Sequence, residues 1–188
     1  MKPHGHHYID FEKNFKIDYP EDWGLAVEQE KEIPSHLLEL YFRFYNLGWI
    51  DQHGDKCIFM AELVRRILRL HGHSATTKEV VLYYQHLEKN INVEIGGYDA
   101  TLEENQVDTH MVCISDGWLL DFAAGPIHWN FGLTFPKSFI SEHSPGNTDY
   151  KSFGDLHGNA TWVPKYPSNQ KIKNWKWQNR EKIIGKVR

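Results

Sequence analysis

The sequence predicts one α+β domain in which N-terminal helices pack on an antiparallel sheet, and three observations lead to that class. A chain of 188 residues is long enough for a single domain that buries roughly two-thirds of its unfolded surface. Apolar residues recur at helical spacing in the first half. After Gly72 the apolar period changes to two, which is typical of strands. We expect one domain over 1–188, with a core over about 33–125 and a loop-rich C-terminal extension over 126–188.

Two helices are expected before the strands. The first opens at Pro34, with Ser35 as its N-cap, and ends at Gly48. Its apolar positions are Leu37, Leu38, Tyr41, Phe44 and Tyr45.

The second helix, over 57–71, follows a loop at 51–55. Its apolar positions recur at helical spacing, and Gly72 ends it. Asp55 is the natural N-cap, which places Cys57 in the first turn.

The strands form a second set of elements after the helices. A hairpin is the clearest of them, because two apolar runs flank Asp116-Gly117, a favoured two-residue turn. Residues 125–160 are rich in Gly, Pro, Asn and His and predict a long loop. The expected strands are 78–87, 91–95, the two arms of the hairpin over 109–123, and a last strand at Trp162-Val163.

Composition excludes several classes of protein. At 40% hydrophobic, 24% charged and 14% aromatic residues, the chain is too apolar to be disordered over most of its length. No apolar run approaches the roughly 20 residues that span a bilayer, and residues 1–10 have no signal-peptide core. Two cysteines cannot form a disulfide scaffold. We expect a cytoplasmic protein with no membrane partner, although a protein exported without a cleaved signal would look the same.

Cys57 is the first candidate for chemistry. A thiol in the first turn of a helix meets unpaired backbone N–H groups and the positive end of the helix dipole, and both favour the nucleophilic thiolate. Lys56 acts in the same direction and Asp55 opposes it. Free cysteines are more often small buried hydrophobic residues, so position alone leaves both interpretations open.

The expected hairpin brings His110 and Asp121 together. If Asp116 and Gly117 are the central turn residues, Asp121 lies diagonal to His110 on the same face, with Cβ atoms roughly 6–8 Å apart. An Asp in an otherwise apolar strand needs such a partner. The pair either orients a catalytic histidine or only ties the hairpin together. The face of His110 should also hold Val112, Ile114, Leu119 and Ala123, and the opposite face Met111, Cys113, Trp118, Leu120 and Phe122, with Cys113 in the core.

Three segments, 54–63, 70–75 and 109–121, together resemble the transglutaminase-like superfamily of papain-type cysteine hydrolases and transferases. That superfamily carries a cysteine on a helix, then a histidine and an aspartate on adjacent strands. The intervals of 53 and 11 residues are similar to those of its compact bacterial members. The resemblance covers about residues 50–125 and implies a papain/transglutaminase-like core, with Cys57 as nucleophile, His110 as base and Asp121 as orienter.

The same resemblance implies an oxyanion hole and a substrate cleft. The backbone N–H of Cys57 is one candidate oxyanion donor. Gln52 is the other, because it resembles the glutamine that precedes the nucleophile in papain-type enzymes; otherwise it is an exposed loop residue. Trp49, His53 and Trp129 are candidates for the cleft, and Trp129 equally suits aromatic packing under a long loop.

The expected function is that of a cysteine peptidase, an amidase or a transglutaminase-like acyltransferase acting on a peptide, protein or small amide. Cys57 would attack the carbonyl carbon and form a thioester, and His110 would protonate the leaving amine. Hydrolysis by water is favoured over transfer, because nothing marks a second substrate site. No cofactor is expected.

Two other functions are compatible with the sequence. From Thr161 onward the chain has eight Lys or Arg and one Glu, so this segment carries +7 and the rest −11. An inactive transglutaminase-like binding module could contact nucleic acid or another anionic partner through the basic, Trp-containing segment 171–177, although the acidic whole argues against nucleic acid. The twelve histidines suggest a metal protein. However, they are scattered without a zinc motif, and His4, His6 and His7 equally suit a flexible end, so no metal is expected.

Overall fold

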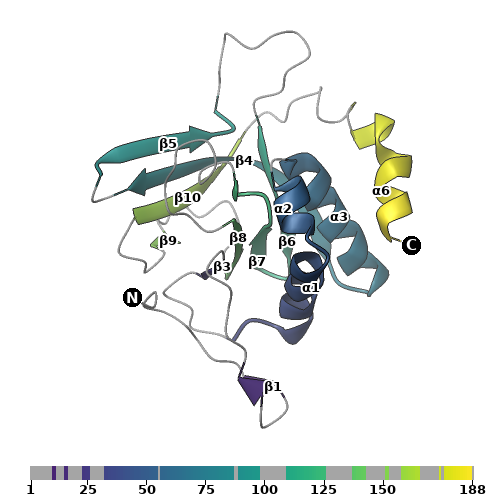
Figure 1. Cartoon of the computed structure of the whole chain (residues 1–188). Helices are drawn as coiled ribbons and strands as arrows, with labels where there is room; N and C mark the ends of the chain where they lie inside the picture. The colour runs from purple at the N-terminus through teal and green to yellow at the C-terminus, as the bar shows by residue number, and fades with distance from the viewer. Residues whose placement is uncertain are drawn as a thin grey trace.

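The computed structural model is an α+β fold, which confirms the expected class. A curled, mainly antiparallel sheet lies beside a group of helices (Figure 1). The structure describes residues 10–11, 15–16, 23–25, 32–54, 56–86, 89–97, 109–125, 137–142, 151–152, 158–165, 174 and 176–187. None of the described helices has both the length and the apolar character needed to cross a bilayer.

The main sheet has eight strands in the order β3-β8-β7-β6-β4-β10-β9, with β5 paired to β4. The long strand β4 is central: its first half pairs with β6, its second half with β5, and β10 lies along its other edge. All described pairs in this sheet are antiparallel except β3 with β8. The bounds are β3 Trp23–Leu25, β4 Ala75–His86, β5 Ile91–Ile95, β6 His110–Ser115, β7 Trp118–Asp121, β8 Ser138–Ser141, β9 Lys151–Ser152 and β10 Gly158–Pro164. A separate two-stranded pair consists of β1 Asp10–Phe11 and β2 Phe15–Lys16.

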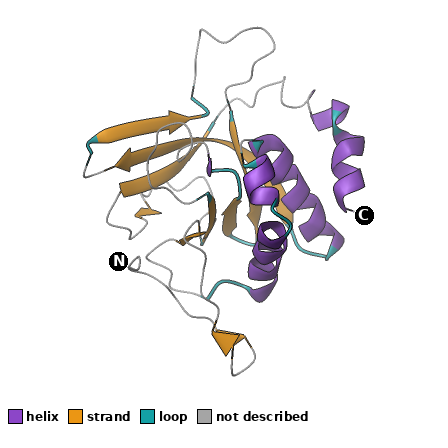
Figure 2. Ribbon diagram, in the orientation of Figure 1, coloured by secondary structure: helices purple, strands orange, loops and turns teal. Residues whose placement is uncertain are grey.

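The helices α1 (Ser35–Asn46), α2 (Trp49–His53) and α3 (Cys57–Leu70) cover one side of this sheet (Figure 2). Helix α3 packs directly on β4, β6 and β7. The main core lies between these layers, and its largest fully buried members are Leu37, Leu38, Tyr41, Phe44, Ile50, Met60, Leu63 and Leu120.

Three local expectations in the helical region were wrong. Ser35 is the first residue of α1, and Pro34 holds the N-cap position without a side-chain cap hydrogen bond. The expected loop at 51–55 is largely helix α2, because Gly48 adopts φ +66°, ends α1 and lets the chain start a new turn in another direction. The N-cap of α3 is Lys56, and Asp55 lies outside the described residues.

The hairpin of β6 and β7 forms as expected. Asp116 and Gly117 have φ of +48° and +86°, which is the pattern of a type I′ turn, and Ser115 pairs with Trp118. Val112, Ile114 and Leu119 belong to a second core on the far side of the sheet from the helices, whereas Cys113, Trp118, Leu120 and Phe122 belong to the main core. Ala123 was assigned to the wrong face, because β7 ends at Asp121 and the alternation ends with it.

The sheet curls around this second core. Phe139 of β8 and Trp162 of β10 have ring centroids only 5.3 Å apart, although three strands separate them in the sheet order. The curl therefore encloses the second core and brings side chains of β7 and β10 together. The buried members of this core include Val80, Leu82, Tyr84, Val93, Val112, Leu119, Phe139, Ala160 and Trp162.

The core does not end near residue 125. Strand β8 lies within the segment expected to be loop, whereas β10 contains the strand expected at Trp162-Val163 and begins earlier, at Gly158. Both belong to the main sheet. Helix α6 (Arg180–Val187) packs on α3, and Ile183 is buried in the main core.

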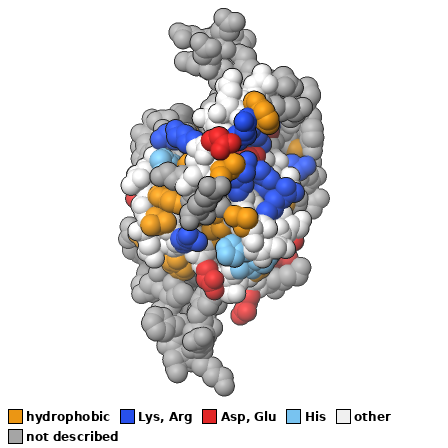
Figure 3. Space-filling view, turned by 90° about the vertical axis from the view of Figure 1, so that its right-hand side faces the viewer, with side chains coloured by type: hydrophobic (Ala, Val, Ile, Leu, Met, Phe, Trp, Pro, Cys, Tyr) orange, Lys and Arg blue, Asp and Glu red, His pale blue; other side chains and the backbone are white. Residues whose placement is uncertain are grey.

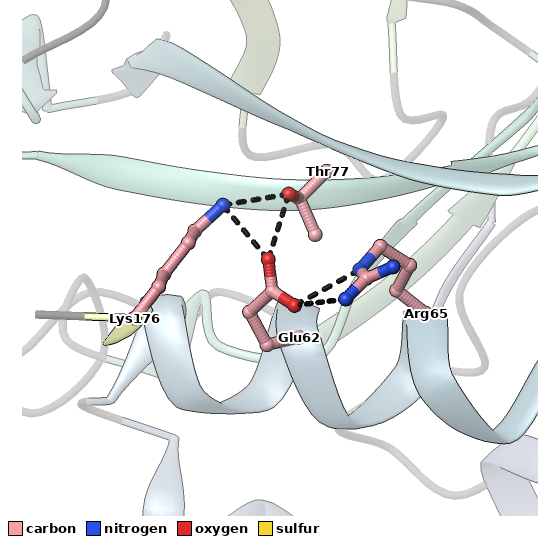
Figure 4. Close-up of polar contacts among 4 residues, drawn as sticks. All are labelled: Glu62, Arg65, Thr77 and Lys176. Carbon is pink, nitrogen blue, oxygen red and sulfur yellow. Dashed lines mark hydrogen bonds and ion pairs between the residues drawn. The ribbon is translucent and has the colours of Figure 1, made fainter. Parts of the chain in front are cut away.

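Lys176 attaches the C-terminal region to α3 by a partly buried polar cluster (Figure 4). Its Nζ lies 2.8 Å from Glu62 Oε1 and donates to Thr77 Oγ1 at 2.8 Å, while Arg65 donates to Glu62 Oε2. Burial raises the pKa of Glu62, but Lys176 and Arg65 outweigh it and hold the pKa below its usual value. The carboxylate is therefore charged and paired at neutral pH.

Candidate active site

His110 and Asp121 form a buried pair at the start of β6 and the end of β7. The Nε2 atom of His110 lies 2.6 Å from Oδ2 of Asp121, and both side chains are almost fully buried. The hairpin register brings the two residues to one face, as the sequence predicted. A bond this short between an imidazole and a carboxylate fixes the orientation and tautomer of the ring.

Asp121 accepts hydrogen bonds at both of its oxygens. Besides His110, the indole Nε1 of Trp162 donates to Oδ2 at 2.9 Å, and the backbone N–H of Ala123 donates to Oδ1 at 3.0 Å. These donors satisfy a carboxylate that would be costly to bury without partners. They also hold the carboxylate in a single orientation toward His110.

Cys57 begins α3 and reaches the same place from the other side of the sheet. Its thiol is partly buried and donates to the carbonyl of Thr109 at 3.4 Å, one residue before His110. The Cys57 side chain also lies close enough to the His110 ring to raise the pKa of that ring. Since Nε2 of His110 is bonded to Asp121, Nδ1 is the ring atom left for the sulfur.

The electrostatics of His110 favour a protonated ring. Burial alone lowers its pKa, but the charge and hydrogen bond of Asp121, followed by the hydrogen bond and charge of Cys57, raise it to about 10. Near neutral pH the ring is therefore an imidazolium between a carboxylate and a sulfur. That state can stabilise a thiolate and can later release a proton.

A second polar network positions Thr109, whose carbonyl meets the thiol. The hydroxyl of Thr109 donates to Glu79 Oε1 at 3.0 Å. Buried Lys165 lies 4.0 Å from the same carboxylate oxygen and donates to the carbonyls of Gly96 and Gly97 at 2.8 and 2.7 Å. The network links Glu79 within β4, and the residues that follow β5 and β10, to the residue that precedes His110.

Gly96 lets these strands approach closely. It has φ +82°, and a Cβ there would contact the backbone N of His110 and come within 2.8 Å of Val80 O. Only glycine allows this approach without displacing the histidine strand.

The other expected site residues have less specific surroundings. Gln52 is exposed on α2. A Cβ added to Gly48 would lie 3.5 Å from Nε2 of Gln52, so the amide side chain sits beside Gly48. Trp49 packs edge-on against Phe44 in the main core, and His53 against Phe59. Trp129 lies outside the described residues.

Cys113 is fully buried, as expected for a core residue. Burial raises the pKa of its thiol to about 12. It is therefore a neutral thiol at ordinary pH, without nucleophilic character.

Sequence reasoning missed Trp162, Glu79, Lys165 and Gly96. Trp162 was expected only as part of a last strand, and its contact with Asp121 depends on the curl of the sheet. The one local signal was charge: Glu79 and Lys165 interrupt apolar stretches, and a buried charge needs a partner.

Some side chains of the basic C-terminal segment make contacts within the protein. Lys and Arg side chains gather on the face that α3 and α6 present (Figure 3). Lys176 is paired with Glu62. Trp177 is 68% exposed, with the guanidinium of Arg180 3.9 Å from its ring centroid. The remainder of the segment 171–177 is described only at Asn174.

Comparison with known proteins supports the fold and goes no further. No protein-family model and no curated protein matches the chain. Among solved structures, it is similar to the crystal structure of genomics APC5867, with a TM-score of 0.54 and 18% sequence identity over 85% of this chain and 80% of that chain. At that identity the similarity concerns the fold alone.

Proposed function

We propose that the protein is a cysteine-dependent acyl-transfer enzyme with a papain/transglutaminase-like core, acting on an amide or peptide bond. The observations that carry this proposal are the 2.6 Å bond from His110 to Asp121 and the closeness of the Cys57 side chain, which raises the pKa of the same ring. A pair that only ties the hairpin together would not need a partly buried thiol bonded to the carbonyl of the residue before His110. The order of nucleophile, base and orienter is that of the superfamily that the sequence resembles.

The reaction proceeds in two steps. The sulfur of Cys57 attacks the carbonyl carbon, its proton resides on His110, and a tetrahedral oxyanion forms. His110 gives its proton to the leaving amine, the C–N bond breaks and a thioester remains. Water, deprotonated by His110, attacks the thioester and releases the acid and the free thiol. Asp121 keeps the ring oriented in both steps.

The oxyanion needs donors that do not move. Cys57 is the first residue of α3, and backbone N–H groups in the first turn of a helix have no partner within the helix. We assign the N–H of Cys57 as one donor. Gln52 remains the candidate for the second, after a rotation of its exposed side chain toward the substrate.

Hydrolysis of a peptide, protein or small amide in the cytoplasm is the form of the activity that we propose. The sequence marks no second acyl acceptor site. A transferase would use the same thioester and replace water with an amine.

Trapping of the acyl-enzyme tests this function. The protein is incubated with a panel of activated amides and esters, and intact mass spectrometry records any covalent adduct, with tandem spectra locating it. We expect an acyl group on Cys57 that hydroxylamine removes, and no adduct in Cys57→Ser. Cys113→Ser is the matched control and should acylate like the parent. Adduct formation that persists in Cys57→Ser, or none with any substrate, would contradict the proposal.

A binding module is the second candidate, favoured by the exposed Trp177 and the basic face around it. Such a module would bind single-stranded nucleic acid by stacking and charge, and binding would weaken steeply with salt. A gel-shift series at increasing salt tests it, with Trp177→Ala expected to weaken binding. No shift at low salt excludes it.

A further inference from the structure

Three side chains that are far apart in the sequence meet at the opposite end of α3 from Cys57. They are His36 in the first turn of α1, His73 after the end of α3, and Asp116 in the β6–β7 turn. One potential ligand atom from each lies within 4.8 Å of those of the other two. We propose that His36, His73 and Asp116 form a binding site for a divalent transition metal ion of the zinc type.

The end of α3 places His73 in a fixed position. The backbone N–H of His73 donates to Leu68 O at 3.0 Å, and that of Gly72 donates to Arg69 O at 3.1 Å. Gly72 has φ +86°. These are the bonds and the left-handed residue of a Schellman motif, so the backbone at His73 is held by the helix itself.

The hairpin turn places Asp116 beside His73. Asp116 adopts the φ of +48° that the type I′ turn requires, and its Oδ2 lies 3.8 Å from His73 Nδ1. The hydroxyl of Ser115 donates to Ser74 O at 2.8 Å and ties the turn to the segment that follows α3. Two of the three ligands are therefore held by backbone contacts independent of any metal.

His36 completes the group. Its ring stacks on that of His73, with centroids 3.8 Å apart and planes 4° from parallel. Its Nε2 is sealed from solvent and has no hydrogen-bond partner within the described part of the chain. A buried ring nitrogen without a partner is costly, and a metal ion would satisfy it.

The donor set suits a metal ion of intermediate softness, such as Zn²⁺. Two imidazoles and one carboxylate, with a water in the fourth position, form a common tetrahedral zinc set with Zn–N distances of about 2.0–2.1 Å. Such a geometry needs ligand atoms about 3.4 Å apart, so the separation of 3.8 Å between His73 and Asp116 must shorten slightly. The stacked rings of His36 and His73 must also tilt away from parallel on binding, because an imidazole binds a metal through a lone pair in its ring plane.

The site is separate from the candidate active site. Helix α3 has 14 residues and therefore extends about 21 Å between Cys57 and the turn that bears His73. An ion held there would tie the start of α1 to the end of α3 and to the hairpin. Its effect would be on stability, whether or not Cys57 is a nucleophile.

The test uses the full chain with two other metal-binding groups removed. His4, His6 and His7 are replaced by Ala, and Cys57 by Ser, in every protein of the series. Zn²⁺ binding is then measured by calorimetry after chelator treatment, Co²⁺ is used as a spectroscopic probe, and Tm is recorded with and without Zn²⁺. The ligand variants are His73→Gln and Asp116→Asn. The control is His71→Gln, an exposed histidine two residues from the site.

We expect one equivalent of Zn²⁺, a tetrahedral Co²⁺ spectrum without sulfur-to-metal charge transfer, and a Tm raised by Zn²⁺ in the parent and in His71→Gln. Loss of a direct ligand should weaken Zn²⁺ binding by more than about tenfold, since loss of outer partners alone costs 10–100-fold. Asn suits the left-handed turn position, so Asp116→Asn should fold even if His73→Gln does not. Equal Zn²⁺ affinity in the parent and in Asp116→Asn, or no binding by the parent, would overturn the site.

Discussion

Replacing Asp121 with Asn should separate the charge of this side chain from its shape. The carboxylate accepts from three donors: two on Oδ2, from His110 and Trp162, and one on Oδ1, from Ala123. An amide of the same shape has one accepting oxygen and one NH₂ group that can only donate. In either orientation of the amide, at least one buried donor then faces another donor. An unpaired buried donor costs about 1–3 kcal/mol of stability.

The larger effect concerns the protonation of His110. Burial lowers the pKa of His110, and chiefly Asp121, with Cys57, raises it to about 10. Against about 6.5 in the unfolded chain, this corresponds to at most about 5 kcal/mol of stability. Because the folded pKa is the higher one, that stability is fully present below pH about 6.5 and is lost as pH rises through about 10. Without the Asp121 charge, most of this contribution to stability should be absent at every pH.

Urea unfolding at pH 6, 8 and 10, together with NMR titration of the His110 ring, measures both effects. Wild type should lose stability across that range and Asp121→Asn should lose less, from a lower starting value, with a lower His110 pKa. Asp51→Asn is the control, because Asp51 is 62% exposed and pairs with Lys137 at the surface, where a salt bridge contributes about 0–1 kcal/mol. If Asp121→Asn has the same stability and the same pH dependence as wild type, the reasoning about this pair is refuted.

Three further predictions concern neighbouring residues. Trp162→Phe keeps the aromatic packing on Phe139 but removes the indole donor to Asp121. Urea unfolding should show a loss of stability of about 1.5–3 kcal/mol, the value for a hydrogen bond to a charged group. No loss of stability would mean that the indole bond is unimportant. Gly96→Ala should unfold the protein or strongly lower its Tm, because the new Cβ meets backbone atoms. Gly117→Ala is the control: its φ is similar but the space around it is open, so it should cost only about 1–2 kcal/mol of stability. Similar Tm values for the two variants would contradict this reasoning. Native protein treated with iodoacetamide should be alkylated at Cys57 alone, because burial raises the pKa of Cys113 to about 12, and early modification of Cys113 in peptide mass spectra would show that the sheet opens there.

The parts of the fold that local chemistry controls were predictable from the sequence. The Asp116-Gly117 turn set the register of β6 and β7, and the register alone brought His110 to Asp121. Helix α3 was predictable from its apolar spacing and from the glycine that ends it.

The parts that depend on long-range pairing were not predictable. Strand β8 has only four residues, and β10 pairs with β4 across more than seventy residues of sequence. The contact of Trp162 with Asp121 follows from the curl of the whole sheet, which no local pattern encodes. The meeting of His36, His73 and Asp116 is of the same kind, because the three belong to different elements with no motif spacing.

Whether His110 activates Cys57 is tested by the alkylation rate of Cys57 as a function of pH, in wild type and in His110→Gln, with folding checked by circular dichroism. If His110 activates the sulfur, wild-type Cys57 should react faster than a small free thiol below pH about 8.5, where that thiol is mostly protonated, and His110→Gln should slow this reaction by at least about tenfold. A Cys57 that reacts like an ordinary thiol, at a rate that His110→Gln leaves unchanged, would contradict this activation.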